Sequence, residues 1–222
     1  MALLGPTHRA GPRAVIFDLD ETLLDRRPAW QYAVEQSIAV VCGRRIDVSG
    51  LVEEYRARPW RHALSIVVES PEERLRCEAL CAQLFERSAL KRLLVHEGIG
   101  MALDALRGES VEMGAISREP HALALKQVQS TGLDRFLAVL APSADGDWDV
   151  ANGMRRCLTF LDRGAEECAF VSGHGEDLAT AAALGCRCFE AGWVNGARTN
   201  FDSIAAPADL GATLWGAWRR GG

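Results

Sequence analysis

A chain of 222 residues is long enough for one α/β domain, or for one domain with a smaller domain inserted into it. Its 48% hydrophobic and 25% charged residues are typical of a globular protein. The net charge of −5 argues against a nucleic-acid-binding role, because that role normally needs a dense basic surface.

The seven cysteines are scattered through segments that we predict to be strands and helices, and no two pairs of them have the spacing of zinc ligands. Reduced, buried thiols in a cytosolic protein are therefore the preferred interpretation. Residues 1–12 contain no apolar stretch long enough for a secretion signal, and no later run is long enough for a membrane span. We expect a cytoplasmic protein that binds neither a membrane nor nucleic acid.

The first predicted strand is the apolar run Ala14-Val-Ile-Phe17, which ends at the polar sequence Asp18-Leu-Asp20-Glu-Thr22. From about Trp30 to Leu106 the apolar residues recur with helical spacing instead. The amphipathic helices predicted in this stretch begin near Trp30 and continue at 52–58, 62–69 and 71–94. No strand is predicted among them, which indicates a helical insertion directly after the first strand.

Strands and helices then alternate to the end of the chain. Strands are predicted at 111–116, 136–141, 168–172 and 186–189, and helices at 120–130, 151–162, 177–184 and 207–218. This alternation predicts an α/β fold with a doubly wound parallel sheet. In such sheets the ligand binds at the carboxyl ends of the strands.

The residues that follow the predicted strands form a chemically coherent set. They are Asp18 to Thr22, Ser117 with Arg118, Pro142 to Asp149, and Ser172 to Asp177. Two carboxylates two positions apart can take the two roles that phosphoryl transfer needs: one attacks phosphorus, and the other gives or takes a proton. A neighbouring hydroxyl can hold the transferred group, and a third acidic residue can complete a Mg²⁺ site of oxygen ligands.

The sequence Asp18-Leu-Asp20-Glu-Thr22 resembles the first signature of the haloacid dehalogenase-like hydrolase superfamily, Asp-x-Asp-x-Thr. The helical insertion after it resembles the first type of cap in that superfamily. The resemblance implies a Rossmann-like α/β core made of residues 1–26 and 108–222, and a helical cap made of residues 27–107. It also implies that the cap selects the substrate.

The same resemblance assigns roles to individual residues. Asp18 is expected to be the nucleophile that forms an aspartyl-phosphate, and its other oxygen is expected to bind Mg²⁺. Asp20 is the expected general acid and base, with its backbone carbonyl as a second metal ligand, and Asp177 is the expected third ligand. Thr22 is expected to fix the loop geometry, and it joins Ser117 and Arg118 in the expected phosphate-binding set.

Two later signatures depart from the family pattern. The third is normally a lysine, but the corresponding stretch has Asp147 at that place, and Lys126 is expected to be a surface residue. Spacing alone does not choose between the arginines that could replace the lysine, which are Arg118, Arg155 and Arg156. The fourth, Gly-Asp-x-x-x-Asp, has Gly173 in place of its first carboxylate. We interpret the adjacent His174 as a loop histidine without a special role, because imidazole is a poor ligand for Mg²⁺.

Two functional hypotheses follow. The first is a Mg²⁺-dependent phosphatase of a small phosphorylated metabolite, similar to the phosphoglycolate phosphatases. The second is a catalytically impaired member that binds a ligand or partner, since positioned positive charge is central to phosphoryl transfer. A dehalogenase is disfavoured because that chemistry does not need Asp20. Five cap-side groups are candidates to face the substrate, although a solvated surface is the preferred interpretation for each: Arg26, Arg27, Trp60, Arg61 and His62. A homodimer stays open.

Overall fold

The computed structural model describes residues 11–48, 50, 60–143 and 149–221. By its internal contacts the chain divides into two compact units, which we describe separately. The first, here called the sheet unit, comprises Met1–Leu23, His96–His121 and Asp134–Gly222. The second, here called the helical unit, comprises Leu24–Val95 and Ala122–Leu133.

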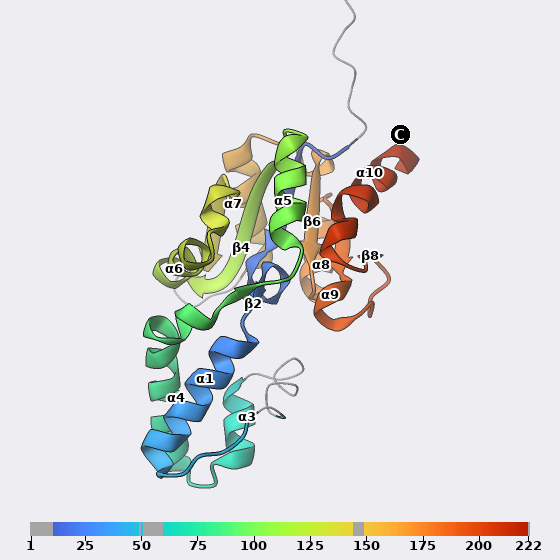
Figure 1. The fold of residues 1–222 in the computed structure, drawn as a ribbon. Helices are drawn as coiled ribbons and strands as arrows, with labels where there is room; N and C mark the ends of the chain where they lie inside the picture. The colour runs from blue at the N-terminus through green and yellow to red at the C-terminus, as the bar shows by residue number, and fades with distance from the viewer. Residues whose placement is uncertain (1–10, 49, 51–59, 144–148, 222) are drawn as a thin grey trace, which may run out of the picture. The chain divides into compact units, whose positions relative to one another are not determined.

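The sheet unit contains a six-stranded sheet in the order β5-β4-β1-β6-β7-β8, in which all neighbours are parallel (Figure 1). Its strands are β1 (Ala14–Asp18), β4 (Glu112–Pro120), β5 (Val139–Ser143), β6 (Cys168–Ser172), β7 (Arg187–Ala191) and β8 (Asp202–Ile204). The predicted doubly wound parallel sheet is thereby confirmed. Every residue of β1 is buried, because β4 and β6 pair with its two edges. The strand order reverses direction at β1, and this switch point is where such sheets bind ligands.

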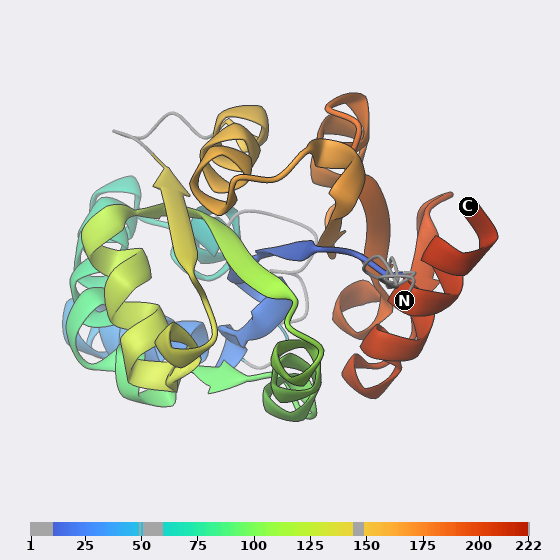
Figure 2. The ribbon, with the colours of Figure 1, turned by 90° about the horizontal axis from the view of Figure 1, so that it is seen from above.

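Helices cover both faces of the sheet. The helices of this unit are α5 (Ile99–Gly108), α7 (Val150–Leu161), α8 (Gly175–Ala183), α9 (Gly192–Asn195) and α10 (Leu210–Gly221). Helices α7 and α8 lie on one face and α5 and α10 on the other (Figure 2). Helix α7 shows why the sequence folds this way, since Val150, Met154, Cys157 and Leu161 recur at helical spacing and are all buried in the core below it.

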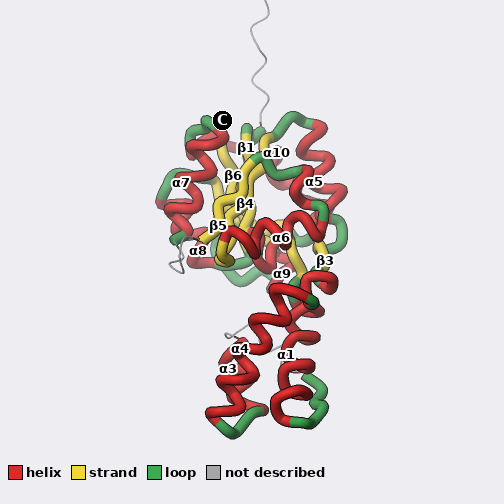
Figure 3. Tube along the Cα trace, turned by 90° about the vertical axis from the view of Figure 1, so that its left-hand side faces the viewer, coloured by secondary structure: helices red, strands yellow, loops and turns green. Residues whose placement is uncertain are grey.

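The helical unit is built mainly on two long helices, α1 (Arg27–Cys42) and α4 (Pro71–Arg87), which pack side by side (Figure 3). The unit also contains α3 (Trp60–Val67) and most of α6 (His121–Thr131). Trp30 of α1 stacks on Phe85 of α4 with ring centroids 4.1 Å apart, and both rings are buried. Helix α4 begins where the sequence predicts, because Pro71 is its first residue and the Ser70 side chain accepts a hydrogen bond from the Glu73 N–H.

Three sequence expectations need correction or restriction in this unit. Two two-residue strands, β2 (Leu24–Asp25) and β3 (Leu94–Val95), pair antiparallel. The sequence predicts no strand at either place, because such short strands leave no periodicity to detect. The expectation of a solvated Arg26 was wrong: its side chain is buried and its guanidinium lies 5.2 Å from the Phe85 ring centroid. The predicted helix at 52–58 and the side chains of residues 60–62 lie outside the described residues.

Helix α5 falls inside the predicted cap range of 27–107, yet it packs against β4 and α10 in the sheet unit. All seven cysteines are free thiols. Burial raises the pKa of the Cys157 thiol to about 12, which keeps it in the unreactive protonated form. Within the described ranges, no helix is both long and apolar enough to cross a membrane.

Candidate active site

The site begins at the carboxyl end of β1. Asp18 is the last residue of that strand, and its side chain is fully buried. The next five residues, Leu19–Leu23, form a single irregular turn in which Glu21 has the left-handed conformation, with φ of 66°. Few non-glycine residues adopt this conformation, so the turn stores backbone strain. His96 stabilises it, since its Nε2 atom lies 2.9 Å from the Glu21 carbonyl oxygen.

Thr22 ties this turn to two other parts of the sheet unit. Its hydroxyl donates a hydrogen bond of 3.0 Å to Oδ2 of Asp18 and accepts one of 3.0 Å from the backbone N–H of Gly173. Its carbonyl oxygen accepts a hydrogen bond of 3.0 Å from the indole N–H of Trp193. Thr22 is fully buried and therefore fixes the Asp18 carboxylate relative to the loop after β6.

Asp20 is held by the end of β4. Its Oδ2 atom accepts hydrogen bonds from the Ser117 hydroxyl at 3.0 Å and from the Arg118 backbone N–H at 2.6 Å. The pairing of β4 with β5 shifts register between Ser117 and Pro120, and such an irregularity re-aims the groups next to it. The structure thus brings Asp20, Ser117 and Arg118 together, as the sequence predicts, with donors directed at the expected acid and base.

The side chain of Arg118 pairs with Asp177. The two groups are 2.5 Å apart, from Nη2 to Oδ2. Asp177 lies in the first turn of α8 and is almost completely buried, whereas the side chain of Arg118 is 40% exposed. Of the three arginines considered as a replacement for the missing lysine, Arg118 is the one that the structure places in the site.

The other two arginines are exposed residues of α7. Arg156 donates a hydrogen bond to the Pro142 carbonyl oxygen. Lys126 of α6 is also exposed, as expected for a surface lysine. Asp147, at the position of the family lysine, lies outside the described residues.

His174, interpreted from the sequence as a loop histidine without a special role, lies beside the expected nucleophile. It immediately precedes α8, and its Nε2 atom lies 3.8 Å from Oδ2 of Asp18, so it borders the expected nucleophile. Burial lowers the pKa of its imidazole, and the nearby Arg118 guanidinium lowers it further. The neutral ring is therefore favoured at pH 7. Its place next to Gly173, inside the fourth signature, was the available signal.

The environment of Asp18 disfavours a negative charge on its carboxyl group. Burial raises the pKa of its carboxyl well above the ordinary value, and the negative charges of Asp20 and Asp177 raise it further. The charge of Arg118 and the hydrogen bond from Thr22 oppose this shift. The Oδ1 atom of Asp18 is buried and has no hydrogen-bond partner among the residues that the structure describes. A proton, or a cation bound at this position, would neutralise a buried carboxyl group of this kind.

Gly173 has a packing explanation. A Cβ atom at this position would lie 2.9 Å from both Cβ and Cγ1 of Val194, which is closer than real Cβ atoms approach. Val194 belongs to α9 and is itself buried. The space in which the family pattern has a carboxylate is therefore filled by a valine side chain.

These residues can be tested against the Mg²⁺ that the resemblance implies. The oxygens of Asp18, Asp20 and Asp177 have the right chemistry, and the unpartnered Oδ1 of Asp18 fits a ligand role. No three His, Cys, Asp or Glu side chains in the described ranges are already grouped as a metal site. The oxygen ligands for a metal are therefore present, but their side chains are not grouped around one position. Arg118 forms an ion pair with the Asp177 carboxylate.

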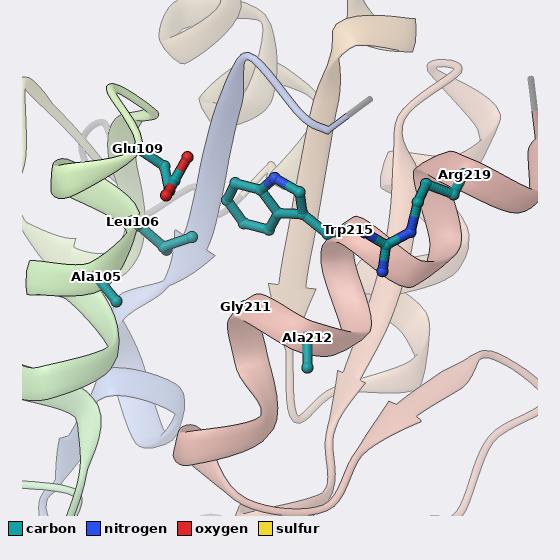
Figure 4. A pocket seen from close by; sticks show the side chains of 7 residues that line it. All are labelled: Ala105, Leu106, Glu109, Gly211, Ala212, Trp215 and Arg219. Atoms are coloured by element: carbon teal, nitrogen blue, oxygen red, sulfur yellow. The ribbon is translucent and has the colours of Figure 1, made fainter. Parts of the chain in front are cut away.

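A separate pocket of about 470 Å³ lies between α5 and α10 in the sheet unit (Figure 4). It is lined by Ala105, Leu106, Glu109, Gly211, Ala212, Trp215 and Arg219. A smaller cavity shares Glu109 and Trp215 with it and is also lined by Arg13 and Val111, which precede β1 and β4. This hollow therefore lies near the amino ends of the strands, away from Asp18, and it is not the predicted site.

Residues 12–185 match the model of the haloacid dehalogenase-like hydrolases. The chain belongs to this family, and it is accordingly a hydrolase of the haloacid dehalogenase-like class. The family predicted from Asp18, Asp20 and Thr22 is thereby confirmed. A comparison with curated proteins gave no match.

Solved structures show the same fold. A subfamily IA, variant 1 hydrolase of the haloacid dehalogenase superfamily from Geobacter sulfurreducens is 17% identical, with a TM-score of 0.78 over 95% of this chain and 100% of that one. A predicted phosphoglycolate phosphatase from Haemophilus somnus is 12% identical, with a TM-score of 0.71 over 94% and 99%. CbbY from Rhodobacter sphaeroides, solved in complex with phosphate, is 16% identical, with a TM-score of 0.66 over 91% and 99%.

Proposed function

We propose that this protein is a phosphatase that hydrolyses a phosphomonoester of a small metabolite through an aspartyl-phosphate on Asp18. The observation that carries the proposal is that two carboxyl groups at one strand end have different environments. Asp18 is buried with one unpartnered oxygen, while Asp20 is fixed by donors from Ser117 and Arg118. One is placed to react and the other to exchange a proton.

In the first step, a carboxylate oxygen of Asp18 forms a bond to phosphorus, and the bond from phosphorus to the leaving oxygen breaks. Asp20 gives its proton to that oxygen, so the product leaves as an alcohol. In the second step, Asp20 takes a proton from a water molecule, whose oxygen bonds to phosphorus. The bond between Asp18 and phosphorus then breaks, which releases phosphate and restores both carboxyl groups.

Positive charge and hydrogen-bond donors must stabilise the transferred group. Arg118 supplies a guanidinium at this end of the site, and His174 supplies an imidazole beside Asp18. Asp18, the backbone carbonyl of Asp20, and Asp177 would hold Mg²⁺, which when bound neutralises charge on the phosphoryl oxygens. The retained Asp20 favours phosphoryl transfer over dehalogenation.

Three further statements belong to the same proposal. We assign the protein to the cytoplasm. We also assign the helical part of the predicted range 27–107 to a substrate-selecting cap, and α5, at the end of that range, to the core together with residues 1–26 and 108–222. The R. sphaeroides structure holds phosphate, which supports a phosphorylated substrate for a protein of this fold. A homodimer stays a prediction.

A second function, binding without turnover, is favoured by one observation: Val194 leaves no room for a carboxylate at position 173. The deciding experiment is hydrolysis of p-nitrophenyl phosphate and a panel of phosphorylated metabolites, with and without Mg²⁺. Wild-type protein is compared with Asp18→Asn and Asp20→Asn, each checked for folding by circular dichroism. Turnover that requires Mg²⁺ and both carboxylates supports the phosphatase. Activity that survives both substitutions, or no turnover at all by folded wild-type protein, contradicts it.

A further inference from the structure

We propose that Arg118 competes with Mg²⁺ for Asp177, so that the metal binds tightly only when a phosphoryl group draws the guanidinium away. The ion pair itself is the first observation. Nη2 of Arg118 lies 2.5 Å from Oδ2 of Asp177, a charge-assisted hydrogen bond to an oxygen that a metal would need. A cation that binds through this oxygen must therefore displace the guanidinium from it.

The two partners differ in how freely they can move. The Asp177 side chain is only 5% exposed, so its charge needs a cation at all times. The Arg118 side chain is 40% exposed, and solvent is available to it when it leaves the pair. Exchange of one cation for another on Asp177 is consequently easier than leaving this carboxylate bare.

The backbone of Arg118 is anchored, so that only its side chain has to move. Its N–H donates to Oδ2 of Asp20 at 2.6 Å, and the preceding Ser117 donates to the same oxygen. A rotation of the guanidinium about the side-chain bonds would leave the contacts to Asp20 intact. The exchange of the Arg118 guanidinium for Mg²⁺ on Asp177, here called the gate, therefore does not disturb the position of Asp20, the expected acid and base.

The carboxylate normally found at position 173 would offer a metal another anchor, but Val194 fills that space. Asp177 is thus the acidic residue of this loop that is buried in the site, since Glu176 is exposed. A metal that cannot use Asp177 loses a large part of its binding energy here. Competition by Arg118 therefore lowers the affinity for Mg²⁺ more in this chain than it would in a chain with a second carboxylate at position 173.

A phosphoryl group supplies what Arg118 would bind instead. Guanidinium groups recognise phosphate oxygens in a planar, two-pronged geometry. Binding of phosphate would release Asp177, and Mg²⁺ could then take that carboxylate. Because coupling between two ligands is reciprocal, phosphate should strengthen Mg²⁺ binding by the factor by which Mg²⁺ strengthens phosphate binding.

The test is calorimetric titration of the full chain, stripped with EDTA, with Mg²⁺ alone and with Mg²⁺ in saturating inorganic phosphate. Wild-type protein should bind Mg²⁺ weakly alone and on the order of tenfold more tightly with phosphate. Arg118→Gln should bind Mg²⁺ alone more tightly than wild type, and phosphate should add little. Arg155→Gln, on the exposed surface of α7, is the matched control and should behave as wild type. Asp177→Asn should lose Mg²⁺ binding in both conditions.

Two results would overturn the gate: Arg118→Gln binds Mg²⁺ no more tightly than wild type, or phosphate leaves the wild-type affinity for Mg²⁺ unchanged. The inference rests on the proposed function in taking Asp177 as a Mg²⁺ ligand and phosphate as the second ligand. Since the titration involves no turnover, a protein that hydrolyses nothing can still show the coupling. An active phosphatase without coupling would refute the gate alone.

Discussion

Val194 packs so closely against Gly173 that a side chain on residue 173 would collide with it. A Cβ atom at that position would lie 2.9 Å from two carbon atoms of the valine. Restoring the family carboxylate by Gly173→Asp should therefore destabilise the protein by about 1–3 kcal/mol through overpacking. Urea denaturation measures this directly. A variant as stable as wild type would show that Val194 moves aside without cost.

The matched test of the same contact is a double-mutant cycle. Val194→Ala removes Cγ1 and Cγ2, which would lie 2.9 Å and 3.1 Å from the new Cβ, but keeps the Val194 Cβ at 2.9 Å. The cost of Gly173→Asp should therefore be smaller in the Val194→Ala background than in wild type, although it should not vanish. If the two substitutions are additive, the methyl groups of Val194 are not the obstacle. The double variant should also bind Mg²⁺ more tightly than Val194→Ala alone, because it adds a carboxylate to the site.

The core and the first carboxylates could be predicted because they depend on local patterns. Alternation of apolar runs indicates parallel strands, and the polar residues after a strand must lie at its carboxyl end. The places of Asp18, Asp20, Ser117 and Asp177 in the fold follow from this reasoning, whereas their roles stay predictions. Short strands such as β2 and β3 could not be, since two residues carry no periodicity.

The partners of these residues could not be predicted from the sequence. Nothing in the spacing of Arg118 and Asp177 indicates that they form an ion pair, because α6, β5, α7 and β6 separate them along the chain. The collision between Gly173 and Val194 likewise depends on how the short helix α9 packs beside the loop after β6. Long-range side-chain packing of this kind is specified by the whole fold and leaves no local signal.

The free energy of unfolding should depend on pH through the raised pKa of the Asp18 carboxyl. Burial, with Asp20 and Asp177, raises the pKa of this carboxyl in the folded state. A raised pKa means that Asp18 contributes stability below its unfolded pKa of about 3.9 and that this contribution is lost as the pH rises through the folded value. In EDTA, Asp18→Asn should therefore be more stable than wild type at pH 8, and the difference should shrink toward pH 4. Urea unfolding at a series of pH values tests this. An Asn variant that is less stable at pH 8, or a constant difference, would contradict the sign.

His174 should matter for catalysis through its ring and not through a full charge, since burial favours the neutral imidazole at pH 7. We expect His174→Ala to lower kcat by about 100-fold, the effect of removing one donor that stabilises the transferred group. His174→Asn, which keeps an N–H donor, should retain more activity than His174→Ala. His121→Ala, at an exposed histidine, is the control and should leave kcat unchanged. Equal rates for wild type and His174→Ala would return the residue to the role of an ordinary loop histidine.

Thr22 offers a substitution that separates shape from hydrogen bonding. Its hydroxyl donates to Asp18 and accepts from the Gly173 N–H, and all of it is buried. Thr22→Val keeps the shape but takes this donor from the fully buried Asp18 carboxyl and this acceptor from the Gly173 N–H, which should cost about 1–3 kcal/mol of stability. Thr22→Ser keeps the hydroxyl and loses one methyl group, so its cost should be about 1 kcal/mol. Urea denaturation gives both values, and phosphatase assays should show the same order, because the hydroxyl positions the Asp18 carboxylate. If valine were tolerated as well as serine, the turn would be held by packing and by the Trp193 contact to the Thr22 carbonyl oxygen, not by the hydroxyl.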